Sequence, residues 1–343
     1  MTEPQARRAA SAWFSGRVDL APLGDGHINE TWLVESPTGR FVLQRLSEAV
    51  FPQPREVATK VANVVEHLAR GNLVAVPALL ATPAGAAWHQ DALGGIWRVW
   101  VFAERTRTLE RLTNAEQGRA AGTAFGRLQV ALADLHGEVA EPIPGFMRLS
   151  RYLDDLEDAL SAHAPDRDTQ TALAVIEPRR DLGSAFSTRD RLIHGDCKIN
   201  NLLFDADRDE VACIIDLDTV MTGNWGWDFG DLVRSAAADG EQVSVDRFAA
   251  ITRGFAGSGA LTMANAELAD TLVLAPRYVA LMLGVRFLTD HLRGDRYFRV
   301  RSHGDNLARA SEQLALLEDM ERRERPLRAA ALRALRSSHS RPG

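Results

Sequence analysis

The sequence contains very little lysine and very little cysteine. Among its 40 basic residues only Lys60 and Lys198 are lysines, and the other 38 are arginines. Cys197 and Cys213 are the only cysteines, which is too few for a fold held together by disulfides. Both fall within one segment of 17 residues, and a disulfide there has no evident use, so we expect two reduced, buried thiols.

The chain also lacks an apolar segment at its start and a long uninterrupted apolar run. Met1–Arg17 has no apolar core of the kind found in signal peptides, which predicts a cytoplasmic protein. The most apolar stretch, Thr271–Leu288, carries Arg277 and Arg286 and is interrupted by Pro276. This pattern predicts a pair of core helices and not a membrane span.

Positive charge is not in excess. The formal net charge is −6, whereas binding to nucleic acid or to a membrane surface needs a clustered basic face. We therefore expect neither a nucleic-acid partner nor a membrane partner. Apolar and charged contents of 45% and 25% are ordinary for a globular protein, and 343 residues can form two lobes, each with its own core.

The segment from His194 to Asp218 contains the residues of a phosphoryl-transfer site at suitable spacing. It begins H-G-D-C-K-I-N-N, so that Lys198 and Asn201 follow Asp196 by two and five residues. In an H-x-D-x-K-x-x-N arrangement the Asp orients or accepts the proton of the substrate hydroxyl, and the Asn binds Mg²⁺. We interpret Asp196 as the catalytic base, and not as a solvated turn residue, and Lys198 as the charge beside the transferred phosphate.

The residues that follow predict where a metal ion binds. Asn201–Asp205 and Val211–Asp216 are short apolar runs joined by the polar segment Ala206–Glu210, a hairpin pattern. Folding this hairpin brings Asn201 next to Asp216, and an amide oxygen with a carboxylate suits Mg²⁺. Asp218 is predicted to be either a second metal ligand or a structural hydrogen-bond acceptor.

A second motif nearby resembles a metal-binding sequence but lies too far along the chain. Asp228-Phe229-Gly230 comes 27 residues after Asn201, beyond the predicted loop Thr222–Trp227. We therefore assign the metal to Asp216. Asp228 is expected to cap a helix or to brace the catalytic loop, and His194 to organise that loop through hydrogen bonds.

Several segments together resemble a known family. They are Gly26–Thr31, Phe41–Leu46, Gly122–Gln129, Ile214–Met221, Asp228–Asp231 and Gly284–Phe298. The chain resembles the aminoglycoside phosphotransferase-like superfamily, kinases of small hydroxyl compounds that share the protein-kinase fold. Within it the sequence is most similar to N-acetylhexosamine 1-kinases, and the likeness extends over nearly the whole chain. It departs from that group in lacking histidines beside Phe146 and Asn306.

The resemblance implies an α+β, protein-kinase-like fold with two lobes and a requirement for ATP and Mg²⁺. Residues 1–103 are expected to form a small lobe with an antiparallel sheet, residues 104–336 a mainly helical lobe, and residues 337–343 a disordered tail. The backbone of Val101 to Ala103 is expected to meet adenine, and a turn containing Gly24 and Gly26 to cover the phosphates.

In the small lobe, Arg45 is predicted to bind the outer phosphates, with a solvated surface arginine as the alternative. Its glutamate partner is left open between Glu56 and Glu66. Apolar spacing predicts an amphipathic helix over 54–70. In the large lobe it predicts helices over 114–135, 152–162, 168–175, 231–238, 245–255, 265–275, 278–292 and 305–335. Glycines at 118, 122 and 126 predict a face of the helix 114–135 that packs closely against a neighbour.

The substrate is predicted from the end of the chain, where residues 271–343 hold 14 arginines and 8 acidic residues. This balance does not suit a polycationic acceptor. Aromatic and hydrogen-bonding side chains that suit a neutral sugar are Trp225, Trp227, Tyr278, Arg286, Asp290 and Tyr297. The sequence therefore predicts a kinase of the anomeric hydroxyl of an N-acetylhexosamine or related sugar. A kinase of an aminoglycoside, homoserine or a choline-like alcohol, or a weakly catalytic nucleotide-binding regulator, is the alternative. Monomer and homodimer are equally compatible.

Overall fold

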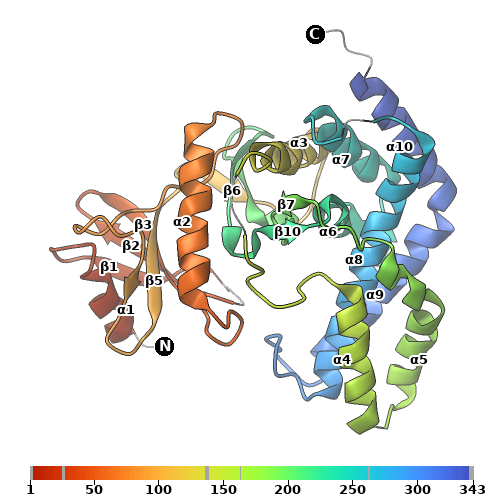
Figure 1. Ribbon diagram of the computed structural model, residues 1–343, viewed down its shortest axis with the longest axis horizontal. Coiled ribbons are helices and arrows are strands. Elements are labelled where there is room, and N and C mark those ends of the chain that lie inside the picture. Colours follow the sequence, from red (N-terminus) through yellow and green to blue (C-terminus); the bar gives the residue numbers. More distant parts are fainter. Residues whose placement is uncertain (1–2, 25–27, 136–138, 163, 262, 340–343) are drawn as a thin grey trace.

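The computed structural model describes residues 3–24, 28–135, 139–162, 164–261 and 263–339. A small lobe with an antiparallel sheet lies beside a larger helical lobe, as expected from the sequence (Figure 1). Helix α2 (Pro54–Arg70) lies between the sheet and the helical lobe in this view. The site described below lies where elements of both lobes meet.

The small lobe is a five-stranded sheet with helices on both faces. Its strands run in the order β1-β2-β3-β5-β4, with antiparallel neighbours throughout. The bounds are α1 Glu3–Ala10, β1 Asp19–Pro22, β2 Glu30–Ser36, β3 Gly39–Arg45, β4 His89–Gln90 and β5 Ile96–Val101.

Alternation along β3 and β5 separates two cores. Phe41 and Leu43 of β3 pack with Trp97 of β5 and with α1 in a small cluster on one face. Val42 and Trp100 belong to the opposite face, which joins the main core through α2. The side of the sheet on which a residue of β3 lies therefore decides whether it is directed toward α1 or toward the helical lobe.

Helix α2 has the bounds that its apolar spacing predicts. Pro54 occupies the first turn, and Val57, Val61, Val64 and Leu68 are buried along one side. These side chains join the main core, which continues without interruption into the helical lobe. Lys60 lies on the same helix, close to the junction between the lobes.

The large lobe is built around a long central helix. Its helices are α3 Ala115–Ala131, α4 Leu149–Ala162, α5 Arg167–Ile176, α6 Trp225–Ala236, α7 Val245–Gly257, α8 Ala266–Leu292, α9 Asp305–Arg322 and α10 Glu324–His339. Its short strands are β6 Thr106–Thr108, β7 Arg191–Ile193, β8 Leu202–Asp205, β9 Val211–Ile214, β10 Met221–Gly223, β11 Ala238–Asp239 and β12 Gln242–Val243. Its 3₁₀ helices are η1 Glu177–Ser184, η2 Ile199–Asn201 and η3 Leu217–Thr219.

The predicted glycine face of α3 packs against α7, which confirms the expectation of close packing. A Cβ atom at Gly122 would lie 2.1 Å from the carbonyl oxygen of Ile251, and one at Gly254 would lie 2.0 Å from that of Arg119. The two helices thus touch backbone to backbone, and each supplies glycine at the points of contact.

Two regions differ from the predicted helices. Residues 266–292 form the single helix α8, because Pro276 removes one backbone hydrogen bond without ending the helix. Helix α8 is long and apolar enough to cross a membrane, but 78% of its most apolar window is buried among other helices. The predicted helix 305–335 is divided into α9 and α10 near Arg323, and α10 continues to His339, three residues into the predicted tail.

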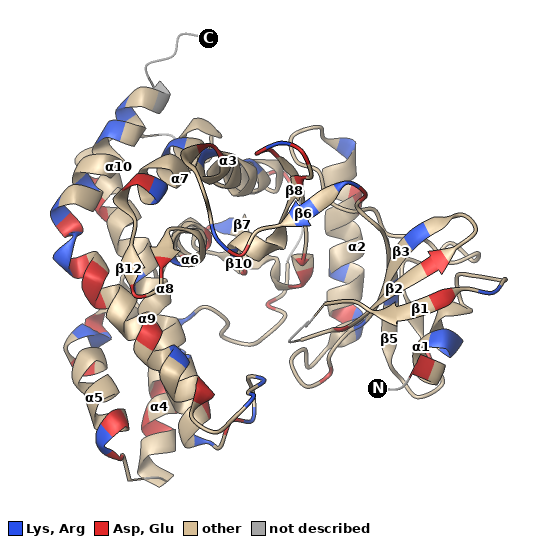
Figure 2. Cartoon of the chain, turned by 180° about the vertical axis from the view of Figure 1, so that it is seen from behind, with Lys and Arg blue, Asp and Glu red and all other residues tan. Residues whose placement is uncertain are grey.

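Described helices carry charge of both signs, and the two cysteines are buried. Side chains of both signs are interspersed along α5 and α9, whereas α10 carries four arginines and has its one acidic residue, Glu324, at its start (Figure 2). Cys197 and Cys213 are buried free thiols, as predicted. Burial raises the pKa of Cys213 to about 11 and that of Cys197 well above its usual value, so both thiols stay protonated and unreactive at neutral pH.

Candidate active site

The loop of residues 194–198, which the sequence predicts to be catalytic, follows β7 and is fixed by two buried side chains. Asp228 of α6 accepts hydrogen bonds from the backbone N–H groups of His194 (2.9 Å) and Gly195 (2.8 Å), so its carboxylate braces the loop. The Nδ1 atom of His194 accepts from the N–H of Asp196, and its Nε2 atom lies 3.0 Å from the carbonyl oxygen of Ile215. His194 therefore joins the loop to the strand that leads to Asp216, the organising role predicted for it.

Asp196 accepts hydrogen bonds from two neighbouring side chains. Its Oδ2 atom accepts from Nζ of Lys198 at 2.8 Å and from Nδ2 of Asn201 at 2.9 Å. Burial alone would raise the pKa of Asp196, but the Lys198 ammonium and these hydrogen bonds outweigh it and hold the pKa below its usual value. The carboxylate is therefore ionised, as required of a group that accepts a hydroxyl proton.

The predicted hairpin brings the two proposed metal ligands together. Strands β8 and β9 pair with Leu202 opposite Ile214, and the N–H of Ile215 donates to the carbonyl oxygen of Asn201. Asp216 comes next, in the left-handed region with φ of 64°. This backbone conformation is uncommon for a residue other than glycine and is often found at functional sites.

The electrostatics of Asp216 fit a cation site. Burial, followed by the negative charges of Asp218 and Asp196, raises the pKa of Asp216 to about 6. A bound cation would offset this concentration of negative charge. Asn201 uses its amide nitrogen to bind Asp196, so it would contribute its amide oxygen to a metal ion. An amide oxygen, a carboxylate and phosphate oxygens form a donor set that suits Mg²⁺.

Asp218 binds the small lobe. Its carboxylate accepts from both terminal nitrogens of Arg98 (2.5 and 2.9 Å) and from Nδ2 of Asn29 (2.6 Å), and its carbonyl oxygen accepts from Lys60 (2.9 Å). The side chains of Arg98 and Asp218 are 2% and 1% exposed, so the pair is fully buried. With both carboxylate oxygens occupied, the geometry favours a structural acceptor over a second metal ligand.

The structure does not bring Arg45 to the catalytic segment. Arg45 follows Phe41 and Leu43 on the face of β3 that packs toward α1, and its guanidinium lies near Glu30 and Glu48. Alternation along the strand places Gln44 on the other face, where its side-chain oxygen accepts from Arg98.

From the small lobe, Lys60 and Arg98 reach Asp218 of this segment. Lys60 also lines a cavity of about 540 Å³ between α2 and residues 139–144. Burial and the nearby Arg98 lower the pKa of Lys60 to about 8, although Asp218 opposes this shift. A phosphate group near Lys60 would stabilise its charged form.

The predicted nucleotide-binding backbone is only partly free. The N–H of Val101 donates to Ala78, that of Phe102 donates to Arg40, and the carbonyl oxygen of Ala103 accepts from Thr106. Gly24 has φ of 69°, which suits the turn between β1 and β2, while Gly26 lies outside the described residues.

Of the residues predicted for the acceptor, Arg286 and Tyr297 come together. They line a cavity of about 570 Å³ with Tyr152 and Phe298. The guanidinium carbon of Arg286 lies 5.0 Å from the ring centre of Tyr152 and 5.6 Å from that of Tyr297. Four arginines line this cavity, at positions 151, 286, 293 and 296.

The predicted tryptophans lie elsewhere. Trp225 begins α6 instead of lying in a loop, because Asn224 caps the helix by accepting from Gly226, and its ring lies 6.2 Å from that of Phe255. Trp227 is buried and stacks on Tyr278, so both belong to the core. Asp290 also lines the cavity, but its carboxylate is occupied by backbone N–H groups of residues 296–298.

The sequence of the chain matches the family model described as the phosphotransferase enzyme family over residues 19–260. The chain belongs to this family. Among solved structures, this phosphotransferase is similar to an amicoumacin kinase in complex with AMP-PNP, Ca²⁺ and Ami, with 13% identity, 95% of each chain covered and a TM-score of 0.66. A microcompartment-associated aminopropanol kinase has 16% identity, coverage of 97% of this chain and 100% of that one, and a TM-score of 0.66. A choline/ethanolamine kinase family protein from Mesorhizobium loti has 18% identity, coverage of 98% and 99%, and a TM-score of 0.62.

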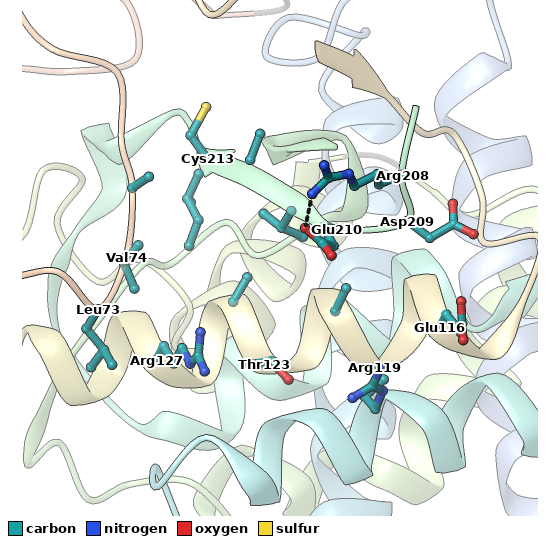
Figure 3. A pocket seen from close by; sticks show the side chains of 16 residues that line it. Leu73, Val74, Glu116, Arg119, Thr123, Arg127, Arg208, Asp209, Glu210 and Cys213 are labelled. Atoms are coloured by element: carbon teal, nitrogen blue, oxygen red, sulfur yellow. Dashed lines mark ion pairs between the residues drawn. The ribbon is translucent and has the colours of Figure 1, made fainter. Parts of the chain in front are cut away.

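A further cavity of the phosphotransferase, about 630 Å³ in volume, lies apart from these residues (Figure 3). It is formed by residues 73–75, α3 and the β8–β9 hairpin, with an ion pair between Arg208 and Glu210 at one side. Asp196, Asn201 and Asp216 do not line it. The largest of the described cavities is therefore separate from the catalytic group.

Sequence reasoning missed Lys60, Arg98 and Asn29. Each had a usable signal: Lys60 is one of two lysines, Arg98 is the lone charge in an apolar strand, and Asn29 lies in the motif Gly26–Thr31. A charged residue in a strand that is otherwise buried requires a buried partner, and Asp218 provides it.

Proposed function

We propose that this phosphotransferase is an ATP- and Mg²⁺-dependent kinase of a small molecule, and that its acceptor is the anomeric hydroxyl of an N-acetylhexosamine or a related sugar. The observation that carries the kinase is the ionised Asp196 held by Lys198 and Asn201 beside Asp216. In this proposal the four side chains would supply the base, the positive charge and the metal ligands with which phosphoryl transfer is assisted by positioning and charge stabilisation.

In the proposed reaction Asp196 orients the acceptor hydroxyl and accepts its proton. The hydroxyl oxygen forms a bond to the γ-phosphorus in line with the bond to ADP, which breaks. Lys198 offsets negative charge on the transferred phosphoryl group, and Asn201 and Asp216 hold Mg²⁺, which neutralises phosphate oxygens when bound. Lys60, which lines the cavity between the lobes, takes the phosphate-binding role that the sequence assigned to Arg45.

The acceptor is inferred from the cavity that contains Arg286. Its aromatic rings from Tyr152, Tyr297 and Phe298 suit stacking against a sugar, and arginines suit hydrogen bonds to hydroxyl and acetyl oxygens. Residues 139–142 and Pro144 line the Lys60 cavity, and Ile143, which lies between them in the sequence, lines the Arg286 cavity. The two cavities are thus neighbours. The lining has four arginines against two acidic residues, Asp155 and Asp290, a balance that favours a neutral acceptor over a polycationic aminoglycoside.

The test is ATP consumption with Mg²⁺ and a panel of acceptors: N-acetylglucosamine, N-acetylgalactosamine, free hexoses, homoserine, choline and kanamycin. NMR then identifies the phosphorylated position. A sugar 1-phosphate supports the proposal. Turnover only with an amine or amino-acid alcohol retains the kinase and rejects the sugar. ATP binding without turnover on any of them rejects these acceptors and favours either an acceptor outside the panel or a nucleotide-binding regulator.

The first prediction concerns the base. Asp196→Asn keeps the hydrogen-bonding shape but cannot accept a proton, so we expect kcat to fall by about 10²-fold or more with ATP binding retained. Turnover by Asp196→Asn within tenfold of wild type would remove Asp196 from the role of base. Calorimetric titration with ATP and a circular dichroism spectrum control for loss of folding.

A further inference from the structure

A second group of metal-ligating side chains lies outside the proposed active site. His291 near the end of α8 and Asp295 and His303 in the connection to α9 each place one ligand atom within 4.8 Å of the others. Nδ1 of His303 lies 3.6 Å from Oδ2 of Asp295, and the two imidazole rings are 5.3 Å apart. The connection that carries them extends from the helical lobe toward the small lobe (Figure 1).

The backbone around this group is held in place by hydrogen bonds. Asp290 accepts from the N–H groups of residues 296, 297 and 298. The amide of the fully buried Asn306 donates to Asp290 (2.9 Å) and to Oδ1 of Asp295 (2.8 Å). Asp295 itself has φ of 57°, and its N–H donates to the carbonyl oxygen of Asp290. Oδ1 of Asp295 is thus occupied by Asn306, while Oδ2 faces His303. Such supporting hydrogen bonds are typical of carboxylates that bind metal ions.

An unsatisfied atom points to a missing partner. Nδ1 of His291 is shielded from solvent and has no hydrogen-bond partner in the part of the chain that the structure describes. Buried polar atoms of native proteins almost always have a partner, and each exception calls for an explanation. A metal ion at this nitrogen would supply one.

We propose that His291, Asp295 and His303 form a binding site for one divalent transition-metal ion of the Zn²⁺ class, with water completing the coordination. Two imidazoles and one carboxylate suit Zn²⁺, Co²⁺ or Ni²⁺, whereas Mg²⁺ prefers oxygen ligands. Ligands of a tetrahedral Zn²⁺ site are about 3.4 Å apart, given bonds of about 2.1 Å. His303, whose side chain is 85% exposed, can rotate to close the remaining distance.

The site has a consequence for the acceptor cavity, and this part rests on the proposed function. The connection between α8 and α9 also carries Tyr297 and Phe298, which line the cavity around Arg286. A metal ion that joins the end of α8 to this connection fixes the aromatic wall. We expect removal of the metal to raise KM for the acceptor severalfold and to leave kcat within about twofold, because the wall contacts the acceptor and not the transferred phosphate.

The experiment measures metal binding without reference to activity. The protein is treated with a chelator, returned to buffer with saturating Mg²⁺, and titrated with Zn²⁺ in equilibrium dialysis. Co²⁺ is added in a parallel titration and followed by its visible absorption. We expect one Zn²⁺ per chain, and a Co²⁺ spectrum of low coordination number with nitrogen ligands. His303→Ala and Asp295→Asn should each weaken binding by about tenfold or more. His89→Gln in the small lobe is the matched control and should bind as wild type does.

Either of two results overturns the site: wild type that takes up no Zn²⁺ beside saturating Mg²⁺, or uptake that both variants retain in full. His303 is exposed, so His303→Ala is expected to fold, and equal thermal midpoints of the metal-free proteins verify this. If Zn²⁺ binds as expected while KM for every acceptor is unchanged by its removal, the metal site stands and its link to the acceptor cavity is rejected.

Discussion

The charge of Lys60 is expected to lower the stability of the fold and, at the same time, to strengthen ATP binding. Its ammonium is enclosed where α2 meets the catalytic segment, and burial together with Arg98 lowers its pKa to about 8, from an ordinary value of 10.5. The unfolded chain therefore holds this proton more tightly than the folded protein does. The resulting cost to stability is fully present below pH 8 and is relieved as the pH rises from 8 to 10.5. Its magnitude is at most about 3 kcal/mol.

We predict that Lys60→Met increases the free energy of unfolding at pH 7 by about 1 to 3 kcal/mol and weakens ATP binding by about tenfold or more. The gain arises because a buried charge is removed, and the loss because a charge-assisted hydrogen bond to phosphate is removed. The stability gain should shrink between pH 8 and 10.5. Urea unfolding at several pH values and calorimetric titration with ATP measure both effects.

Arg45→Met is the matched control, because Arg45 is a cation of the same lobe that lies near Glu30 and Glu48. We expect its affinity for ATP to equal that of wild type. The reverse outcome, with ATP binding lost in Arg45→Met and kept in Lys60→Met, would restore the interpretation made from the sequence.

The side chains that the sequence predicts well are those close together in the chain. Asp196, Lys198 and Asn201 lie within six residues, and the hairpin that adds Asp216 is itself local, so spacing alone indicates their meeting. Arg98 and Asn29 meet Asp218 across 120 and 189 residues. No pattern among neighbouring residues of the sequence indicates a contact over such a separation. The prediction that Arg45 binds phosphate depends likewise on the orientation of β3, which is set by what covers each face of the sheet and not by neighbouring residues in the sequence.

Among the helices, the contact between α3 and α7 depends most on the absence of side-chain atoms. A Cβ atom at Gly122 would lie 2.1 Å from the carbonyl oxygen of Ile251 and 2.9 Å from the N–H of Phe255. Both neighbours are backbone atoms, so neither can rotate away. The contact has room for an extra methyl group only if the two helices separate.

We therefore predict that Gly122→Ala destabilises the protein by about 3 kcal/mol, even though alanine is the better helix former. Chemical unfolding measures the change. Gly257→Ala is the control, because this helical glycine of α7 has no atom within 4 Å of the added Cβ, and it should leave stability unchanged or raise it by up to about 1 kcal/mol. Equal effects of the two substitutions would refute the packing argument.

Helix boundaries could be predicted where the spacing of apolar residues and a residue typical of a helix end indicate the same boundary. Helix α2 has both, with Pro54 at its start and buried valines along one side, and its predicted bounds of 54–70 are correct. Helix α8 was divided at Pro276 because proline usually ends a helix, but packing on all sides maintains this one. Helix α6 begins earlier than predicted because Asn224 caps it, a role that the surrounding glycines obscured.

The two lobes share one core and one buried ion pair. The main hydrophobic cluster runs from Leu46, α2 and Trp100 into the helices of the large lobe. Beside it, Arg98 of the small lobe binds Asp218, two residues after the proposed metal ligand Asp216. The small lobe is thus tied closely to the proposed metal-binding turn, because Asp218 follows Asp216 by only two residues. We expect the protein to unfold in a single cooperative transition, because the main hydrophobic cluster extends across both lobes.

The buried pair gives the last prediction. Arg98→Met leaves the Asp218 carboxylate buried with only Asn29 and Lys60 beside it, and breaking such a pair costs about 3 to 5 kcal/mol. Asp218→Asn added to Arg98→Met removes the uncompensated charge and still accepts from Asn29. The double variant should therefore be more stable than Arg98→Met, a coupling that urea unfolding of the full cycle measures.

Arg328→Met breaks the exposed pair with Asp270 and should change nothing measurable. If Arg98→Met changes the free energy of unfolding as little as Arg328→Met does, the buried pair does not hold the lobes together. The proposed connection between the small lobe and the turn that contains Asp216 is then rejected as well.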